Sequence, residues 1–208
     1  MGRAKLAPRR EPQQARSRER VARILSAAAK LVERGGVAAA NTNAIAEQAG
    51  LPVGTLYQFF PNRDAVLKAL MQSQLEKFDQ ALWPLLAPSE DEQPLEVQVG
   101  RIVDALAKAY LQVPGLAPLL RALRSEAQFG ELSAKNNEIV AEALSALVRR
   151  RMPRVSRRRA GAIARAAVEA SDGVLMHWLA TQDRLLLVEL KAMLRSYAAD
   201  LISRAEHE

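Results

Sequence analysis

Apolar residues recur at helical spacing along most of this chain, and the breaks between the apolar stretches fall at glycine, proline and polar cap residues. This pattern predicts an all-α protein, because helices bury one face and end at such residues. No strands are predicted. The predicted helices cover residues 16–34, 43–49, 53–60, 63–84, 95–113, 116–129, 132–151, 156–181 and 184–205.

Two short helices lie close together within residues 41–63. Asn41 and Thr42 are cap-type residues ahead of the first helix, and Gly50 ends it because glycine takes the left-handed conformation without steric cost. Pro52 stands where a first-turn proline is tolerated, so the second helix begins directly afterwards. The pair predicts a helix-turn-helix, whose second helix is of the kind that enters a DNA major groove. Its inner face is formed by Ile45, Ala49, Leu51, Leu56 and Phe60.

The outward side of the second short helix has the composition of a surface that meets an anion. It carries no acid, a glycine that permits close backbone approach, hydroxyls for phosphates and an amide for phosphate or base edges. The residues that remain outside the apolar face are Val53, Gly54, Thr55, Tyr57, Gln58 and Phe59. The alternative is a plain helical hairpin in which Tyr57 and Phe59 are half-buried core. It is disfavoured because a helix exposed only to water rarely shows such aromatics without charge.

The same stretch resembles the DNA-binding signature of the TetR (tetracycline repressor) family of transcriptional regulators, from about residue 20 to residue 70. The matching residues are Thr42-Asn43-Ala44-Ile45-Ala46, Ala49-Gly50-Leu51, Gly54-Thr55-Leu56-Tyr57-Gln58-Phe59-Phe60, Arg63 and Leu67. Chain length and the all-helical remainder also fit this family. The resemblance implies a DNA-binding domain followed by a helical domain for ligand binding and dimerisation.

The resemblance also implies two sets of DNA contacts. The base readers would be Asn43, Val53, Thr55 and Phe59. The phosphate contacts would be Thr42, Tyr57 and Arg63. Two positions depart from the family pattern. Pro52 replaces a serine that commonly caps the recognition helix, and Phe59 replaces a tyrosine or histidine, which favours apolar contact such as with a thymine methyl.

The positive charge of the chain is concentrated at its front. Residues 1–34 hold ten Lys or Arg against three Glu, and this excess equals the net charge of +7 of the whole sequence. We therefore expect three parts: a flexible basic arm at 1–15, a helix-turn-helix domain at 16–62 and a helical regulatory and dimerisation domain at 63–208. The arm can contact DNA, with a disordered, solubilising tail as the alternative. The two are compatible, because such arms often become ordered only on DNA.

Composition limits the other classes of function. The hydrophobic content of 49% is that of a globular protein, the apolar runs are too short for a membrane span, and no signal peptide precedes them, so we expect a cytoplasmic protein. The sequence contains no cysteine. His177 and His207 are far apart, no glycine-rich phosphate loop follows a strand, and no metal-ligand spacing recurs. An enzyme is the weak alternative, and no cofactor or metal is expected.

The last two predicted helices are apolar on more of their surface than packing on one core requires. The second of them carries two stripes, formed by Leu185, Leu186, Leu187, Val188, Leu190, Met193, Leu194, Tyr197, Leu201 and Ile202. The first has a face of mainly small residues, formed by Ala160, Ile163, Ala167, Ala170, Gly173 and Val174. We expect a homodimer held by a four-helix interface, as the resemblance implies, with burial inside a monomer as the alternative.

A cavity for a small lipophilic effector is implied by the resemblance in the C-terminal region. Aromatic, thioether and polar side chains are the candidates for its wall: Phe78, Trp83, Tyr110, Glu126, Phe129, Met176, His177 and Trp178. Asn136, Asn137 and Asp172 are further polar residues nearby. For any single residue, ordinary core is the competing interpretation.

The function expected from these features is a ligand-responsive repressor that binds a pseudo-palindromic double-stranded DNA operator as a homodimer. The competing hypothesis is a DNA-binding protein of the same fold that answers to a protein partner or has an architectural role, which a filled core would favour. A second cluster of arginines lies within residues 149–159. It is interpreted as a solvated loop between helices rather than as a further anion contact.

Overall fold

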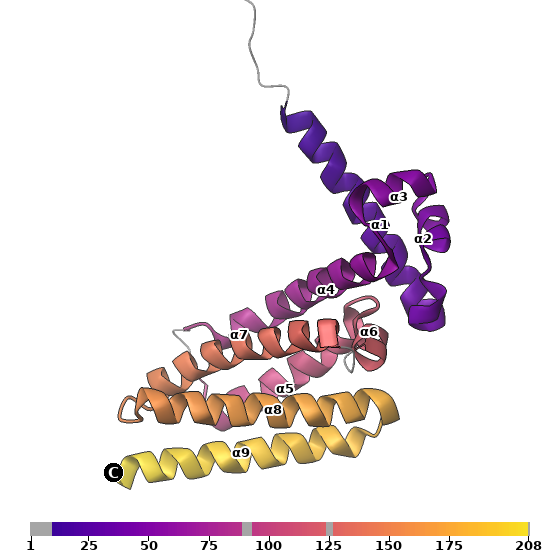
Figure 1. The fold of residues 1–208 in the computed structure, drawn as a ribbon. Helices are drawn as coiled ribbons and strands as arrows, with labels where there is room; N and C mark the ends of the chain where they lie inside the picture. The colour runs from indigo at the N-terminus through magenta and orange to yellow at the C-terminus, as the bar shows by residue number, and fades with distance from the viewer. Residues whose placement is uncertain (1–9, 89–92, 124–126, 208) are drawn as a thin grey trace, which may run out of the picture. The chain divides into compact units, whose positions relative to one another are not determined.

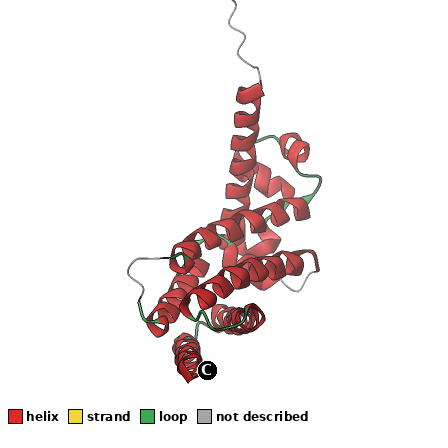
Figure 2. Ribbon diagram, turned by 90° about the vertical axis from the view of Figure 1, so that its left-hand side faces the viewer, coloured by secondary structure: helices red, strands yellow, loops and turns green. Residues whose placement is uncertain are grey.

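The computed structural model describes residues 10–88, 93–123 and 127–207. Within these residues every regular element is an α-helix (Figure 2), which confirms the predicted fold class. The chain divides into two compact units, Met1–Leu70 and Met71–Glu208. The division falls inside the fourth helix, whereas the sequence placed it at the start of that helix. The helices are α1 Arg10–Ala39, α2 Thr42–Ala49, α3 Val53–Phe59, α4 Arg63–Leu86, α5 Leu95–Gln112, α6 Leu116–Leu123, α7 Ala127–Arg151, α8 Arg157–Thr181 and α9 Arg184–His207 (Figure 1).

The first unit is a three-helix core followed by the start of α4. Helix α1 packs against α2, and α2 packs against α3. The core has no solvent exposure at Ile24, Ala28, Val32, Ile45, Leu56, Val66 and Leu67. These positions follow the helical spacing seen in the sequence, so the apolar pattern accounts for this core.

The turn between α2 and α3 forms as predicted. The Ala44 N–H donates to Asn41 Oδ1 at 2.9 Å, which makes Asn41 the N-cap of α2. Gly50 adopts φ 62° and ψ 40°, and the Leu51 N–H donates to the Ala46 carbonyl at 3.0 Å. Pro52 precedes α3 without a side-chain cap. The sharp turn therefore fixes where α3 begins and the direction in which it leaves α2.

Helix α1 differs from the prediction at both ends. It begins at Arg10, so residues 10–15 are helical rather than part of a free arm. Pro12 lies in the first turn, where the missing N–H has no helical partner to lose. At the other end Gly36 leaves the helical conformation with φ 69° and ψ −177°, and residues 37–39 then add another turn. The sequence had ended the helix at this glycine pair.

Replacing Gly36 with alanine should destabilise the first unit by about 1–3 kcal/mol, because its backbone conformation is essentially restricted to glycine. Hydrogen exchange at the amides of α1 and α2 measures this loss. Gly54→Ala is the matched control, since Gly54 has open space around its Cα and should tolerate a methyl group without loss of stability. Equal protection in both variants would contradict the backbone argument.

The sequence predicted helix boundaries wrongly at two places in the second unit, the end of α4 and the boundary between α6 and α7, and burial explains both. Helix α4 continues through Pro84 to Leu86. Leu82 and Leu86 are both buried one turn apart, so the last turn is held by packing. Helix α7 begins at Ala127 and passes through Gly130, where the sequence had ended one helix at residue 129 and begun the next at 132. Phe129 is completely buried, which offsets the roughly 1 kcal/mol cost of a helical glycine.

In the second unit, α8 lies between α7 and α9 in a row of long helices (Figure 1). Helix α5 packs along α9. The buried residues where α5, α7, α8 and α9 meet are Leu95, Val148, Met152, Ala160, Ile163, Ala198 and Leu201. Among the described helices, none has both the length and the apolar character required to cross a membrane.

Candidate functional site

The outward surface of α3 is the candidate DNA-contacting face of the first unit. Leu56 is buried and anchors the helix, whereas Val53, Gly54 and Gln58 are exposed. Tyr57 is 52% exposed, which argues against the half-buried interpretation of this ring. Thr55 and Phe59 are partly buried. Val53, Gly54, Tyr57 and Gln58 are the four exposed residues of α3, and the helix contains no acidic residue.

The structure brings together the two predicted phosphate-contacting hydroxyls. Thr42 Oγ1 and Tyr57 Oη lie 3.3 Å apart, across the turn that separates α2 from α3. Asn43, next to Thr42 at the start of α2, is exposed. A phosphate oxygen accepts hydrogen bonds from hydroxyls, so this pair can hold one phosphate beside a free amide side chain. The base-reading and phosphate-holding roles themselves stay predictions.

Arg63 has a structural contact that the sequence did not suggest. Its Nε donates to the Ala40 carbonyl at 3.1 Å, and its Nη2 donates to the Val37 carbonyl at 2.6 Å. These carbonyls close the C-terminal end of α1, where a cation is favoured. Arg63 therefore ties the start of α4 to the end of α1. A phosphate contact from its remaining N–H groups stays a prediction.

Arg23 makes a second tie of the same kind. Its Nη2 donates to the carbonyls of Ala49 at 2.6 Å and Gly50 at 3.3 Å. The contact joins α1 to the turn that orients α3. The sequence counted Arg23 only among the basic residues of the front region, and no local pattern there distinguishes it from its neighbours. Of the predicted arm, residues 1–9 lie outside the described part of the chain.

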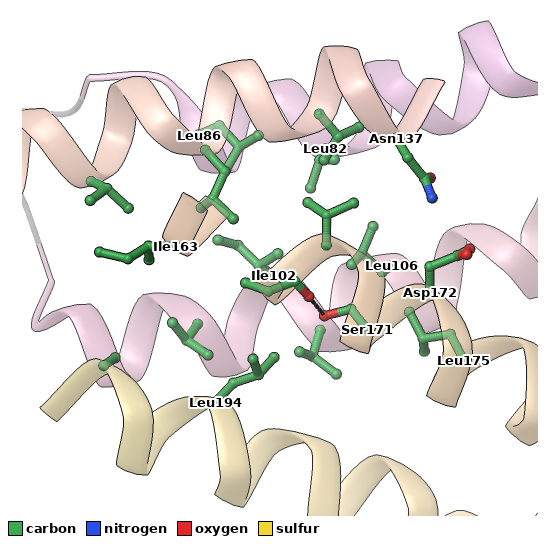
Figure 3. Close-up of a pocket in the computed structure, with 18 of the residues that line it drawn as sticks. Leu82, Leu86, Ile102, Leu106, Asn137, Ile163, Ser171, Asp172, Leu175 and Leu194 are labelled. Carbon is green, nitrogen blue, oxygen red and sulfur yellow. Dashed lines mark hydrogen bonds between the residues drawn. The ribbon is translucent and has the colours of Figure 1, made fainter. Parts of the chain in front are cut away.

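The second unit contains an apolar cavity of about 110 Å³. Helices α4, α5, α7, α8 and α9 supply its wall (Figure 3). The wall consists mainly of aliphatic residues, including Leu82, Leu86, Ile102, Val103, Leu106, Val140, Leu144, Ile163, Leu175 and Leu194. Its polar lining comes from Tyr110, Asn136, Asn137, Ser171, Asp172 and Tyr197. A mostly apolar cavity with few polar groups is typical of a site for a small organic ligand.

The sequence found part of this wall. Phe78 and Tyr110 line the cavity, with ring centroids 4.6 Å apart. The further polar residues Asn136, Asn137 and Asp172 also line it. The described lining residues do not include the candidates Trp83, Phe129, Met176, His177 and Trp178. Phe129 and Trp178 are buried in the core, and His177 is exposed. Glu126 lies outside the described residues. Aromatic type alone therefore did not separate a core position from a cavity wall.

A half-buried carboxyl, that of Asp79, lies behind the cavity wall. Asn136 Nδ2 donates to Asp79 Oδ1 at 3.3 Å. Burial raises the pKa of the Asp79 carboxyl, the hydrogen bond from Asn136 lowers it, and the neighbouring Glu76 raises it. Ser171 Oγ donates to the Ala167 carbonyl at 2.7 Å, so this hydroxyl is held against its own helix. The amide of Asn136 is thus oriented by a carboxyl that does not itself line the cavity.

The arginine cluster after α7 is partly engaged in holding loop backbone. Arg151 Nη2 donates to the Gln93 carbonyl at 2.8 Å, and Arg150 Nη2 donates to the Ala87 carbonyl at 3.4 Å. Arg154, Arg157 and Arg158 are exposed. Arg150 and Arg151 therefore have a structural role within the second unit.

The exposed face of α8 and α9 differs from the predicted one on α8. Ala160 and Ile163 are buried in the unit's own core, because α8 turns this side toward α5, α7 and α9. The other predicted residues of this face are partly buried (Ala167, Ala170 and Val174) or exposed (Gly173). Besides Gly173, the small residues that α8 exposes are Ala162, Ala166 and Ala180. On α9 the exposed stripe consists of Leu185, Val188, Ala192, Ser196, Ala199 and Ser203. Both stripes keep helical spacing, so each helix presents one face without a partner in its own unit.

Each of the two units matches a known family of protein domains. Residues 24–70 match the model of bacterial regulatory proteins of the tetR family, and residues 94–197 match a tetracyclin repressor-like C-terminal domain. The chain is similar to the HTH-type transcriptional repressor KstR of Mycolicibacterium smegmatis, with 34% identity over 92 residues, which is 44% of this chain and 45% of the relative. The matched region thus spans less than half of that relative.

Solved structures agree with this placement. A TetR-family transcriptional regulator from Streptomyces coelicolor is 26% identical with a TM-score of 0.62, over 87% of this chain and 98% of that chain. A TetR transcription regulator from Haloarcula marismortui is 21% identical with a TM-score of 0.71, over 88% of this chain and 98% of that chain. The second likeness concerns the fold alone.

Proposed function

Since the chain belongs to the TetR family of bacterial regulatory proteins, we propose that it is a cytoplasmic, ligand-responsive transcriptional repressor that binds a pseudo-palindromic operator as a homodimer. The observation that carries the proposal is the pairing of Thr42 and Tyr57 hydroxyls beside the exposed surface of α3. A helix fixed at its entry by Gly50 and offering hydroxyl, amide and apolar groups outward has what major-groove recognition requires.

Ligand response is supported by the cavity. Helix α4 begins at Arg63 in the first unit and contributes Phe78, Leu82 and Leu86 to the cavity wall. A ligand that prefers one position of these side chains changes the equilibrium of the helix that also contacts the DNA-binding core. The ligand acts only by as much as it prefers the state that does not bind DNA. A filled core would have favoured control by a protein partner, and the cavity argues against it.

The test of this function is binding of the purified protein to its own upstream intergenic DNA across a salt series, with a random duplex as control. We expect selective binding with a steep salt slope, because phosphate contacts release counterions. Equal affinity for both duplexes would contradict an operator in that region. Absence of binding at low salt would contradict the DNA-binding function itself.

Asn43→Ala and Tyr57→Phe should separate base reading from phosphate holding. Asn43→Ala should weaken operator binding by about 1–3 kcal/mol and leave random-duplex binding nearly unchanged, because a base contact carries the sequence preference. Tyr57→Phe removes one hydroxyl of the Thr42 pair and should weaken both duplexes alike. Competition binding measures both ratios.

Gln48→Ala is the control for Asn43→Ala, since Gln48 is an exposed amide on the same helix and belongs to no predicted contact. It should leave both affinities unchanged. If Asn43→Ala lowers binding to the operator and the random duplex by the same factor, Asn43 is not a base reader.

A further inference from the structure

The first turns of α1 extend past α2 and α3 (Figure 1). Ile24 and Ala28 are completely buried in the core of the first unit, and Val21 is partly buried. Ser17 continues the same stripe at helical spacing but is exposed, so the core ends between these two turns. The side chains of residues 15–20 are all exposed. This part of α1 therefore projects from the core and is free to meet a partner.

Three arginines form a row along one face of this helix. Arg16, Arg20 and Arg23 have the spacing i, i+4 and i+7, whereas Arg18 lies on the opposite side. Arg23 is held in place, because its Nη2 donates to the two carbonyls at the end of α2. Arg16 and Arg20 are exposed. The row thus starts at the turn between α2 and α3 and continues for about 10 Å along the projecting part of α1.

The turn that Arg23 contacts lies on the side of the first unit where DNA would bind. In a helix-turn-helix, the first residues of the second helix contact base edges. Helix α3 begins directly after this turn, and its first residues, Val53 and Gly54, are exposed. Residues 15–23 carry four arginines against one acid, Glu19. DNA bound at the start of α3 would therefore bring its phosphates next to a surface of opposite charge.

We propose that Arg16 and Arg20 bind the phosphate backbone of the DNA beside the start of α3. This inference rests on the proposed DNA-binding function and adds a second anchoring element to it. An arginine fork can donate two parallel hydrogen bonds to one phosphate. Phosphate contacts position a protein on DNA without reading its sequence, so the two arginines raise the affinity for any duplex and leave the choice of operator to α3.

Arg16→Gln and Arg20→Gln test the contact, with Arg18→Gln as the matched control. All three remove one positive charge from an exposed arginine of the same helix, and glutamine has nearly the helix propensity of arginine. Each full chain is titrated with the operator duplex and a random duplex across a salt series. Arg16→Gln and Arg20→Gln should each lower the slope of log affinity against log salt by about one per bound subunit. Arg18→Gln should keep the slope of the unsubstituted protein.

Two results of these titrations would overturn the inference. An equal fall of the slope in all three variants would mean that the arginines act through the total charge of the helix and not through a direct contact. A larger loss of affinity on the operator than on the random duplex would mean that the arginines read bases, as in a minor groove. The midpoint of thermal unfolding should be the same in all three variants, because the substituted side chains are exposed.

Hydroxyl-radical footprinting of the operator locates the contact on the DNA. The double variant Arg16→Gln/Arg20→Gln, at a concentration that saturates the duplex, should lose protection at one short run of sugars beside each bound α3. The remaining protection should be unchanged, because α2 and α3 are intact. A footprint identical to that of the unsubstituted protein would contradict the contact.

Operator selectivity of the unsubstituted protein separates this inference from the proposed function. If that protein selects its operator and the variants at Arg16 and Arg20 match the Arg18→Gln control, the backbone contact is wrong while the regulator stands. If it binds both duplexes equally but loses salt slope only in the variants at Arg16 and Arg20, the backbone contact stands and operator recognition fails. Absence of binding to either duplex at low salt would overturn both.

Discussion

Replacing Arg63 with alanine should lower the free energy of unfolding of the first unit by about 1.5–3 kcal/mol, because it removes a charged donor of two hydrogen bonds. The carbonyls of Val37 and Ala40 would lose a cation at the C-terminal end of α1, where it is favoured. Hydrogen exchange at the amides of α2 and α3 measures this loss of stability in the first unit separately from the second unit. We expect operator affinity to fall at the same time, because α3 is positioned by this core.

Arg63→Lys separates the structural tie from a phosphate contact. Lysine keeps the charge but not the planar fork that reaches two carbonyls, so stability should fall nearly as far as in Arg63→Ala. DNA binding measured well below the melting temperature should recover in Arg63→Lys only if the charge also contacts phosphate. Lys68→Ala, an exposed cation on the same helix, is the control. If the amides of Arg63→Ala are as well protected from hydrogen exchange as those of Lys68→Ala, the hydrogen bonds of Arg63 do not stabilise the first unit.

Helix ends were predictable from the sequence where a local cap decides them. Asn41 and Gly50 close α2 through their own side chain or backbone conformation, and the structure has both contacts. Pro84 and Gly130 misled the prediction, because each local preference is overridden by burial of nearby residues on the same helix. Such burial depends on tertiary packing, and the sequence pattern of a single helix does not show which other elements pack against it.

The two candidate sites differ in how far sequence alone predicts them. The surface of α3 is defined by the residues that its short amphipathic pattern leaves outside, so Val53, Tyr57 and Gln58 were placed outward correctly. The cavity wall is made largely of aliphatic residues, and the sequence pattern does not distinguish these residues from aliphatic residues of the filled core. Trp178 is buried without reaching the cavity, while Tyr110 lines it. Only the relative placement of five helices decides between them.

Leu185→Arg should convert the proposed dimer into a monomer and weaken operator binding by about 10²–10⁴-fold, because linked half-site contacts are lost. Leu185 is 67% exposed and begins the unpartnered stripe of α9 that continues through Val188 and Ala192. In a dimer built on this stripe, the arginine would be desolvated against an apolar face. Light scattering after size exclusion gives the mass, and a duplex titration gives the affinity.

Leu111→Arg is the matched control, since Leu111 is 59% exposed at the end of α5, outside the α8 and α9 stripes. The two substitutions add the same charge to similarly exposed leucines, so general effects on solubility or non-specific DNA attraction should be equal. If only Leu185→Arg yields a monomer, the α9 stripe is the subunit interface. If both variants keep the mass of a dimer, the interface lies elsewhere. The face of small residues on α8 then has no assigned partner, because its pairing was inferred together with that of α9.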